Sequence, residues 1–497
     1  MKRVFSVIIL GSLSLSLSAN PENNDFNKQV SRQAASSTPA FPGAEGGGWN
    51  STGGRGGKIL YVTNLEDYGK SEKPVTGSLR WAVEQEGPRM VLFKVSGNIP
   101  LKETLVIENA DLTIAGQSAP GDGICVKDHG ILIQADNVMI RFIRCRLGDV
   151  SGKSADAIGG SYFKGGILDH CSFSWSIDEV CSFYYMIDHT IQWCIISEGL
   201  HQSAHWKGAH GKGSIWGGTN CTLHHNLYAH NFDRNPRFVQ DKYYKGPEDD
   251  PYLGASDCRN NVMFNWGSTA TYGGENRKFN LVANYYKPGP ASIKPKIFFK
   301  PTFQNHFPGG TFYIADNYIT TSADASKEKT KGILYDPDKA TKGQPVFMER
   351  PFEITGPVTT HTPQEAYHLV LSHAGASLSR DAVDVRIAEE VASGKPTFTG
   401  SRSGFKGIPD TPADTGGYPV LKSLPAPVDR DGDGIPDAWE EKNGLNPDDA
   451  SDGNTYTLDQ NYTNVEVYLN TLVQHIIDAQ SQGGGGISDK KYKTEWL

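Results

Sequence analysis

The feature that most constrains the fold is a unit that repeats between about residues 111 and 317. Each unit has a polar or Asn/Gly turn, a short run of β-branched and aromatic residues, and a second turn. The spacing between the centres of these runs is irregular, but it stays within the range of one coil in a repeat protein. The expected strand centres are Ile114, Ile140, Leu168, Ile191, Leu223, Val262, Leu281 and Ile314.

The connections between these runs decide the type of sheet. Antiparallel hairpins need turns of roughly two to five residues, and the gaps here are longer without supplying crossover helices. Parallel coils stacked into a solenoid remain, so we predict an all-β chain of that kind. The longer gaps, such as residues 240–255, are then loops on one side, where they would wall a binding groove.

Two short helices are predicted beside the coils. Ser78 is a suitable N-cap for a helix that ends at Gly87, and this helix would close the N-terminal edge of the solenoid. Thr362 begins a second helix, with Pro363 at its first position and Glu365 completing a capping box. We expect this second helix to end at Gly375 and to pack beyond the last coil.

The two ends of the chain differ from the solenoid in composition. Residues 1–19 have the basic start, apolar run and small residues of a secretory signal peptide, and the run is too short to span a bilayer. We therefore expect a secreted protein, extracellular or periplasmic. The predicted divisions are a signal peptide (1–19), flexible leader (20–40), solenoid (41–416), linker (417–428), calcium-loop and helix module (429–480) and tail (481–497).

The Pro-rich linker predicts that the C-terminal module is independent of the solenoid. Its apolar residues between Val465 and Ile476 recur at the spacing of one helix face, which indicates a single final helix. Truncation after Gly416 is therefore expected to leave the solenoid folded and active.

Charge and cysteine content exclude several functions. The net charge of −8 comes with dispersed Lys and Arg, so nucleic acid is not an expected partner. The seven cysteines are odd in number and form no CxxC pair, which indicates neither a zinc site nor a full disulfide framework. An anionic substrate would need local cations or a bridging metal.

The segment "DRDGDGIPDAWE" has the spacing of a calcium-binding EF-hand loop. Gly434 stands at the sixth place, where the chain turns sharply, and the carbonyl of Ile435 would be the seventh-place ligand. We predict a structural calcium site here. The side-chain ligands expected at the first, third, fifth, ninth and twelfth places are Asp429, Asp431, Asp433, Asp437 and Glu440.

A second set of acids lies within the repeat, at Asp156, Asp169, Asp178 and Glu179. On successive coils, such residues can stack at one lateral position about 4.8 Å apart. Clustered carboxylates are hard oxygen ligands suited to Ca²⁺, so a calcium site is the functional interpretation. The alternative is that each Asp caps a turn.

The order of several motifs resembles the polysaccharide lyase family of pectate lyases. They run from "FPGAEGGG" through "GGRGGKILYVTNL", "APGDGI", "DAI", "DHCSFSW", "DEV" and "IISEGL" to "RNP". The resemblance implies a right-handed, single-stranded parallel β-helix that cleaves 4-linked galacturonan by β-elimination. It also implies a Ca²⁺ cofactor, a polygalacturonate or pectin substrate, unsaturated oligogalacturonate products, and a monomer.

The resemblance also implies roles for individual residues. Arg234 matches the family's catalytic arginine, Asp156 its first acidic calcium ligand, and Asp178 or Glu179 its last. The family's second arginine aligns with Val239, which leaves Arg237 as the candidate for that cationic contact. The family's substrate-binding lysine aligns near His201, and the candidates for substrate contact are Arg237, His201 and Lys207.

Two other functions remain open at this point. Polygalacturonan hydrolases use clustered carboxylates as acid and base without calcium. A non-catalytic solenoid would bind glycans by stacking aromatic residues such as Trp206 and Trp216 on sugars.

Overall fold

The computed structural model describes residues 38–240, 253–303, 307–340, 342–481 and 485–486. The expected signal peptide, most of the leader and most of residues 240–255 and 481–497 lie outside the described residues. Residues Pro39–Leu497 form one compact unit. Among the described residues, no helix is long and apolar enough to cross a membrane.

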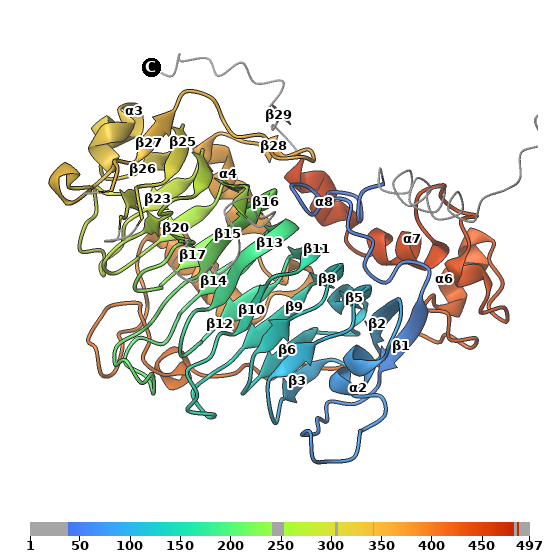
Figure 1. The fold of residues 1–497 in the computed structure, drawn as a ribbon. Coiled ribbons are helices and arrows are strands. Elements are labelled where there is room, and N and C mark those ends of the chain that lie inside the picture. The colour runs from blue at the N-terminus through green and yellow to red at the C-terminus, as the bar shows by residue number, and fades with distance from the viewer. Residues whose placement is uncertain (1–37, 241–252, 304–306, 341, 482–484, 487–497) are drawn as a thin grey trace, which may run out of the picture. The chain divides into compact units, whose positions relative to one another are not determined.

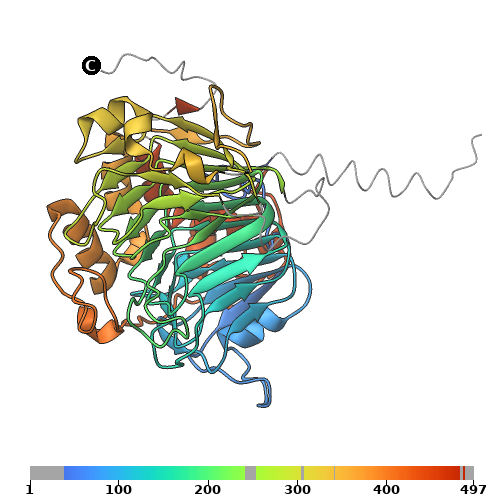
Figure 2. The same ribbon diagram turned by 60° about the vertical axis from the view of Figure 1, so that its left-hand side comes forward.

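Two parallel sheets wind together through the repeat, and their strands stack side by side in Figures 1 and 2. The fold is the expected right-handed parallel β-helix. The strands of the larger sheet are β1 (Lys58–Val62), β2 (Arg89–Phe93), β4 (Leu105–Ile107), β5 (Leu112–Ala115), β7 (Ile131–Ile133), β8 (Val138–Arg141), β10 (Ile158–Ser161), β11 (Lys164–Asp169), β13 (Cys181–Gln192), β15 (Ile215–Thr219), β16 (Cys221–His224), β18 (Arg237–Phe238), β19 (Ala255–Arg259), β21 (Thr271–Gly273), β22 (Lys278–Val282), β24 (Phe299–Pro301), β25 (Thr311–Ala315) and β27 (Val346–Met348). The strands of the smaller sheet are β3 (Gly97–Pro100), β6 (Ile124–Lys127), β9 (Ile143–Arg146), β12 (Ser172–Ser174), β14 (Ile195–Ser197), β17 (Leu227–Ala229), β20 (Val262–Phe264), β23 (Tyr285–Lys287) and β26 (Tyr318–Ile319).

The register of the larger sheet confirms seven of the eight expected strand centres. They follow one another in a single buried column that runs from Ile114 in β5 to Ile314 in β25. Val262 is the exception, because it lies in β20 of the smaller sheet and pairs with Leu227. Cys258 takes the place in the column that was expected for Val262.

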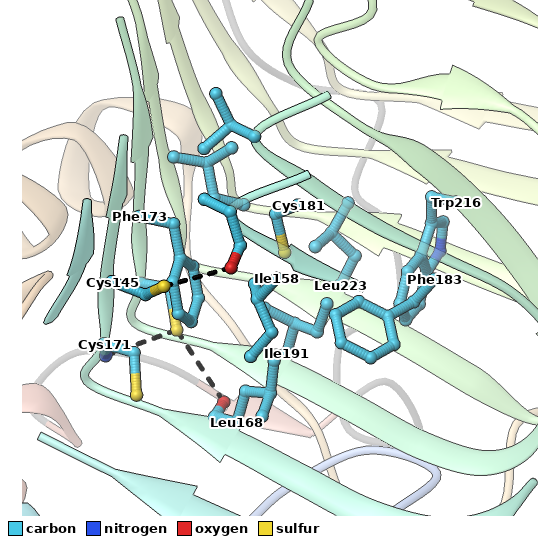
Figure 3. Packing of buried hydrophobic residues seen from close by; sticks show 14 of the residues in the cluster. Cys145, Ile158, Leu168, Cys171, Phe173, Cys181, Phe183, Ile191, Trp216 and Leu223 are labelled. Atoms are coloured by element: carbon cyan, nitrogen blue, oxygen red, sulfur yellow. Dashed lines mark hydrogen bonds between the residues drawn. The ribbon is translucent and has the colours of Figure 1, made fainter. Parts of the chain in front are cut away.

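The interior between the sheets is apolar and contains the cysteines. Cys145, Cys171 and Cys181 pack among Phe, Ile and Leu side chains in the view of Figure 3. All seven cysteines are buried and free, so they act as small core residues.

Asparagines hold one corner of the coils together. Asn226, Asn261 and Asn284 lie at equivalent turns, and the side-chain oxygen of each following asparagine accepts from the backbone N–H of the one before it. The residue before each asparagine has a positive φ, for example His225 at 53°. The Asn turns of the repeat are therefore a hydrogen-bonded ladder along the solenoid.

A glycine-rich segment, residues 43–57, lies against the outside of the larger sheet. The backbone N–H groups of Gly47 and Gly48 donate to the hydroxyls of Thr222 and Thr190 at 3.0 and 2.9 Å. A Cβ on Gly47 would lie 1.6 Å from the carbonyl oxygen of Asn220. Only glycine allows this close approach of two backbones, which explains the glycines of "AEGGG". We call residues 43–57 the glycine strap.

The two helices beside the coils have the predicted caps. Ser78 accepts from Trp81 at the start of α2 (Leu79–Glu84), and Thr362 and Glu365 form the capping box of α4 (Pro363–His373). The predicted place of α4 is wrong, because the helix packs along the smaller sheet instead of beyond the last coil. Its Val370 shares an apolar cluster with Ile195 and Leu227.

A further helix follows α4 on the same side of the coils. Helix α5 (Ala382–Ser393) is held by Asp384, which pairs with the buried guanidinium of Arg146 at 2.9 Å. A further helix among the described residues is α3 (Ala323–Lys327), and β28 (Thr359–Thr360) pairs with β29 (Gly485–Gly486) as two short antiparallel strands.

The segment after the linker packs on the first coils. It contains α6 (Asp437–Asn443), α7 (Asn464–Thr471) and α8 (Gln474–Gln480), so the predicted single final helix is divided in two. Ile435, Val465 and Leu469 form one buried cluster with Met90 and Leu92 of β2. These contacts argue against the expectation that the residues after Gly416 can be removed without loss of folding.

We expect Leu469→Ala to destabilise the whole protein by about 2–5 kcal/mol, the usual cost of truncating a buried leucine. Leu469 is 4% exposed and contributes to the contact between the C-terminal segment and β2. Denaturant unfolding measures the effect. Val420→Ala is the control, because that side chain is 87% exposed in the linker. Equal unfolding midpoints for Leu469→Ala and the wild type would contradict the docking of this segment.

Candidate functional site

The candidate site follows the turns that lead into four successive strands of the larger sheet. Asp156 precedes β10, Asp178 and Glu179 precede β13, Lys212 precedes β15, and Arg234 precedes β18. These strands pair in that order. The stacking of the coils therefore brings together side chains that are far apart in the sequence.

Three of the predicted carboxylates meet. Asp156, Asp178 and Glu179 each contribute an oxygen to a group whose members lie within 4.8 Å of one another. The Oδ1 of Asp156 also accepts from the backbone N–H of Glu179 at 3.0 Å. Burial, together with the negative charge of Asp178, raises the pKa of Asp156 well above its ordinary value. A divalent cation would relieve this repulsion.

Asp169, the fourth acid of the predicted set, belongs to a different part of the molecule. It is fully buried, and Oδ2 accepts from the guanidinium of Arg141 at 2.8 Å while Oδ1 accepts from Gln192. Burial opposes ionisation of this carboxyl, but the charges of His170 and Arg141 outweigh it and lower the pKa of Asp169. This residue is therefore part of the packing between coils.

Two histidines also contact the carboxylate of Asp178. The Nε2 atoms of His210 and His205 lie 2.8 and 3.4 Å from its oxygens. Burial opposes ionisation of Asp178, but the hydrogen bonds and charge of these histidines outweigh it and lower the pKa of the carboxyl.

The tautomer of His205 follows from its other nitrogen. The backbone N–H of Lys207 donates to Nδ1 of His205 at 3.0 Å, so the proton of the neutral ring is on Nε2. The Nε2–H of His205 therefore faces the carboxylate of Asp178 at 3.4 Å without forming a hydrogen bond of good geometry. The sequence places His205 and His210 in a glycine-rich loop that is a candidate groove wall, and in the structure both lie against the carboxylate of Asp178.

Arg234 lies at the edge of the carboxylate group. Its Nη1 contacts the carboxylate of Glu179, and its Nε donates to the hydroxyl of Tyr272 at 3.3 Å. Its backbone has a φ of 60°, which is uncommon for a residue with a side chain. The same left-handed conformation recurs at other turns of the repeat, such as His225 and Asn260, so it belongs to the geometry of the coils.

Lys212 is a site residue that the sequence did not reveal. Its backbone forms parallel bridges with Glu179 on one side and Asp233 on the other, so it lies in the same lateral column. Its Nζ is 2.8 Å from the carboxylate of Asp233. The family's substrate-binding lysine was expected near His201, and the structure brings Lys212 to this column instead.

The three residues predicted to contact the substrate have different surroundings. Arg237 lies beside the ring of Tyr272, which Arg234 also contacts, and 3.9 Å from Glu275. Lys207 is exposed, and its Nζ lies over the ring of Trp206 at 4.7 Å.

His201 differs from these two because it is 5% exposed and its ring stacks on that of Phe232, with 4.1 Å between the ring centroids. This packing leaves His201 no surface for a sugar. Of the two tryptophans considered for glycan stacking, Trp206 is 77% exposed whereas Trp216 is buried in the core.

The predicted calcium loop lies at the C-terminal segment, remote in sequence from these residues. Asp429, Asp431 and Asp433 form one group of oxygens within 4.8 Å, and Asp433 shares a second group with Glu440 and Asp452. Burial and the charges of neighbouring acids raise the pKa of Asp433 and that of Glu440 to about 7.

Asp437, a predicted ligand, is not a member of either acidic group. Its two oxygens accept from the backbone N–H and the Nε of Arg430 at 2.9 and 2.7 Å. Asp452, which was not predicted, lies beyond the end of the loop in sequence and takes part in the acidic group. The carbonyl of Ile435 stays a prediction.

Comparison with known proteins gives a consistent result. No family model matches the chain. The chain is 34% identical to a probable pectate lyase C of Aspergillus flavus over 444 residues, which are 87% of this chain and 94% of the relative. It is 33% identical to the corresponding protein of Aspergillus fumigatus over 451 residues, 89% of this chain and 95% of the relative.

Solved structures of pectate lyases are also similar. A mutant of the Bacillus subtilis pectate lyase has 16% identity and a TM-score of 0.46, covering 70% of this chain and 99% of that chain. The matches to the two Aspergillus proteins extend over most of both sequences, and they show that this chain belongs to the pectate lyase family.

Proposed function

We propose that this chain is a calcium-dependent lyase that cleaves 4-linked galacturonan by β-elimination and releases unsaturated oligogalacturonates. The observation that carries this proposal is the meeting of Asp156, Asp178 and Glu179 with Arg234 along one column of turns. The names of the two Aspergillus relatives support the same chemistry.

The three carboxylates suit calcium because Ca²⁺ prefers hard oxygen ligands. Burial and the neighbouring charge of Asp178 raise the pKa of Asp156, and a cation at this place would stabilise its ionised form. Both Asp178 and Glu179 belong to the group, so the proposed ligand set includes both. Calcium held here would act as a Lewis acid on the uronate carboxylate, which becomes more negative when the α-proton leaves.

Arg234 is the proposed proton acceptor. A free guanidinium accepts a proton poorly near neutral pH, so the residue needs surroundings that favour loss of its own proton. Lys212 lies in the neighbouring coil but pairs with Asp233 at 2.8 Å, so the added positive charge would come from a cation on the carboxylates. The hydrogen bond from Nε to Tyr272 fixes the plane of the guanidinium.

The remaining cationic and aromatic residues would bind the polymer. Arg237 and Lys212 lie near Arg234, and the exposed pair Trp206 and Lys207 lies beside the histidines that hold Asp178. Lysine and arginine match uronate carboxylates, and an exposed tryptophan can stack on a sugar ring. His201 does not belong to this set, because Phe232 covers its ring.

The test is an assay of the purified chain on demethylated polygalacturonate with calcium. We expect ultraviolet absorbance of an unsaturated uronate to appear together with new reducing ends. Reducing ends without that absorbance would mean hydrolysis and would overturn elimination. Binding without either product would support the non-catalytic alternative.

We also propose that the protein is exported as a monomer, as residues 1–19 predict for the compartment. The mass of the mature protein, measured after expression in a secreting host, should correspond to cleavage near Ala19.

A further inference from the structure

The acids of the C-terminal segment converge from two separate stretches of chain. Asp429, Asp431, Asp433 and Glu440 come from the loop and first turn of α6, and Asp452 begins the short helical turn Asp452–Asn454. Asp433 is common to both groups of oxygens, so the two groups adjoin at this residue. A Cβ on Gly453 would lie 2.2 Å from Oδ2 of Asp433, which shows how closely the second stretch lies over the first.

The loop uses some of its carboxylate oxygens to form itself and leaves others unused. Oδ1 of Asp431 and Oδ1 of Asp433 accept from backbone N–H groups at 3.2 and 2.8 Å. Their Oδ2 atoms, both oxygens of Glu440 and Oδ1 of Asp452 are buried and have no hydrogen-bond partner among the described residues. Glu440 is 0% exposed and Asp433 is 4% exposed. A cation bound between them would stabilise the ionised form of these buried carboxylates.

The same loop touches the first coils of the β-helix. The hydroxyl of Tyr61 in β1 donates to Asp429, and the Nζ of Lys94 lies 3.7 Å from the same carboxylate. Ile435 is fully buried beside Met90 and Leu92. The arrangement of the acids and the docking of the segment therefore depend on one another.

We propose that Asp429, Asp431, Asp433, Glu440 and Asp452 bind a calcium ion that fastens the C-terminal segment to the first coils. Asp452 is proposed in place of Asp437, because Asp452 belongs to the acidic groups whereas Asp437 lies outside them and accepts from Arg430. This ion supports folding and has no part in the elimination reaction.

Calcium fits this set better than other biological cations. It takes six to eight oxygen ligands and tolerates irregular geometry, whereas Mg²⁺ requires a near-ideal octahedron with retained water. The set contains only carboxylates, without the histidine or cysteine that zinc and copper prefer. The negative charge of five neighbouring acids also makes a bound divalent cation more favourable than an empty site.

The experiment compares two substitutions within the same segment. Full-length wild type, Asp452→Asn and Asp437→Asn are stripped with chelator, and their melting temperatures are measured with and without CaCl₂. We expect calcium to raise the melting temperature of the wild type and of Asp437→Asn by similar amounts. Asp452→Asn should lose most of that shift, and its calcium Kd at this site should rise by about tenfold or more, because charged ligands set the affinity of such loops.

Each outcome decides the proposal. An equal calcium shift in Asp452→Asn and the wild type would overturn it, as would a larger loss in Asp437→Asn than in Asp452→Asn. If Asp452→Asn does not fold, Glu440→Gln serves as the second variant with the same expectation. Activity of the calcium-saturated variants is measured in parallel, and a loss of turnover in a folded variant would contradict the separation of this ion from catalysis.

Discussion

Arg234→Ala should lower the turnover of polygalacturonate by at least about a hundredfold, the lower end of what a positioned acid or base contributes. The physical reason is the place of Arg234 beside Glu179, within the column that holds Asp156 and Asp178. The measurement is the initial rate of unsaturated product formation at saturating substrate and calcium.

Two further variants separate chemistry from binding. Arg234→Lys keeps the positive charge but loses the planar guanidinium, so it should recover substrate binding more than turnover. Arg237→Ala is the matched control, because this neighbouring arginine is proposed to bind the polymer. Its main effect should be a higher KM with a smaller change of kcat.

The stability of the Arg234 variants must also be known. Their unfolding midpoints should stay close to that of the wild type, since Arg234 lies in a turn outside the core. Near-normal turnover of Arg234→Ala would remove this residue from the mechanism. The role would then pass to Lys212 or Arg237.

Removal of calcium should abolish activity, and Asp156→Asn should weaken the response to added calcium by about tenfold or more. The carboxylate of Asp156 lies within 4.8 Å of Asp178 and Glu179, so its loss takes one charged oxygen ligand from the proposed set. The measurement is the elimination rate as a function of free calcium after chelator treatment.

The Asp452→Asn variant is the control for this second prediction. It should keep the wild-type activation curve at temperatures below its melting point, because its acids lie in the C-terminal segment. Asp156→Asn should show the reverse behaviour, with a normal calcium effect on melting. Full activity in excess chelator, with metal removal confirmed, would refute calcium-dependent catalysis by this chain.

The fold could be predicted largely because each coil repeats the same local requirements. Buried strands, Asn turns and helix caps are local features, and α2 and α4 begin at the predicted Ser78 and Thr362. The prediction for Val262 fails because each coil contains more than one short apolar run and the coils differ in length. Nothing local distinguishes β19 from β20.

Packing between distant segments was harder to predict from the sequence. The apolar face between Val465 and Ile476 is evident in the sequence, but a helical face does not identify its partner. Its partners in β2 lie near the opposite end of the described chain. The same reason applies to α4, whose capping residues fix where it begins but not which sheet it covers.

The candidate site was predicted where a motif fixes the spacing. Asp156, Asp178, Glu179 and Arg234 were all identified, and the coils bring them together. Lys212 was missed because residues 201–211 lengthen its coil. Counting residues along the chain from the family motif therefore ends near His201 instead of at Lys212. Asp452 was missed because it lies outside the calcium loop in sequence and joins it only through the fold.

The glycine strap has a consequence for the order in which parts of the chain fold. Gly47 and Gly48 leave the ribosome early, yet their hydroxyl partners, Thr222 and Thr190, are 175 and 142 residues later in the chain. The strap cannot settle until those coils have formed and stacked beside it. This early segment therefore finds its place only after much later coils have formed, and such long-range closure makes folding slow.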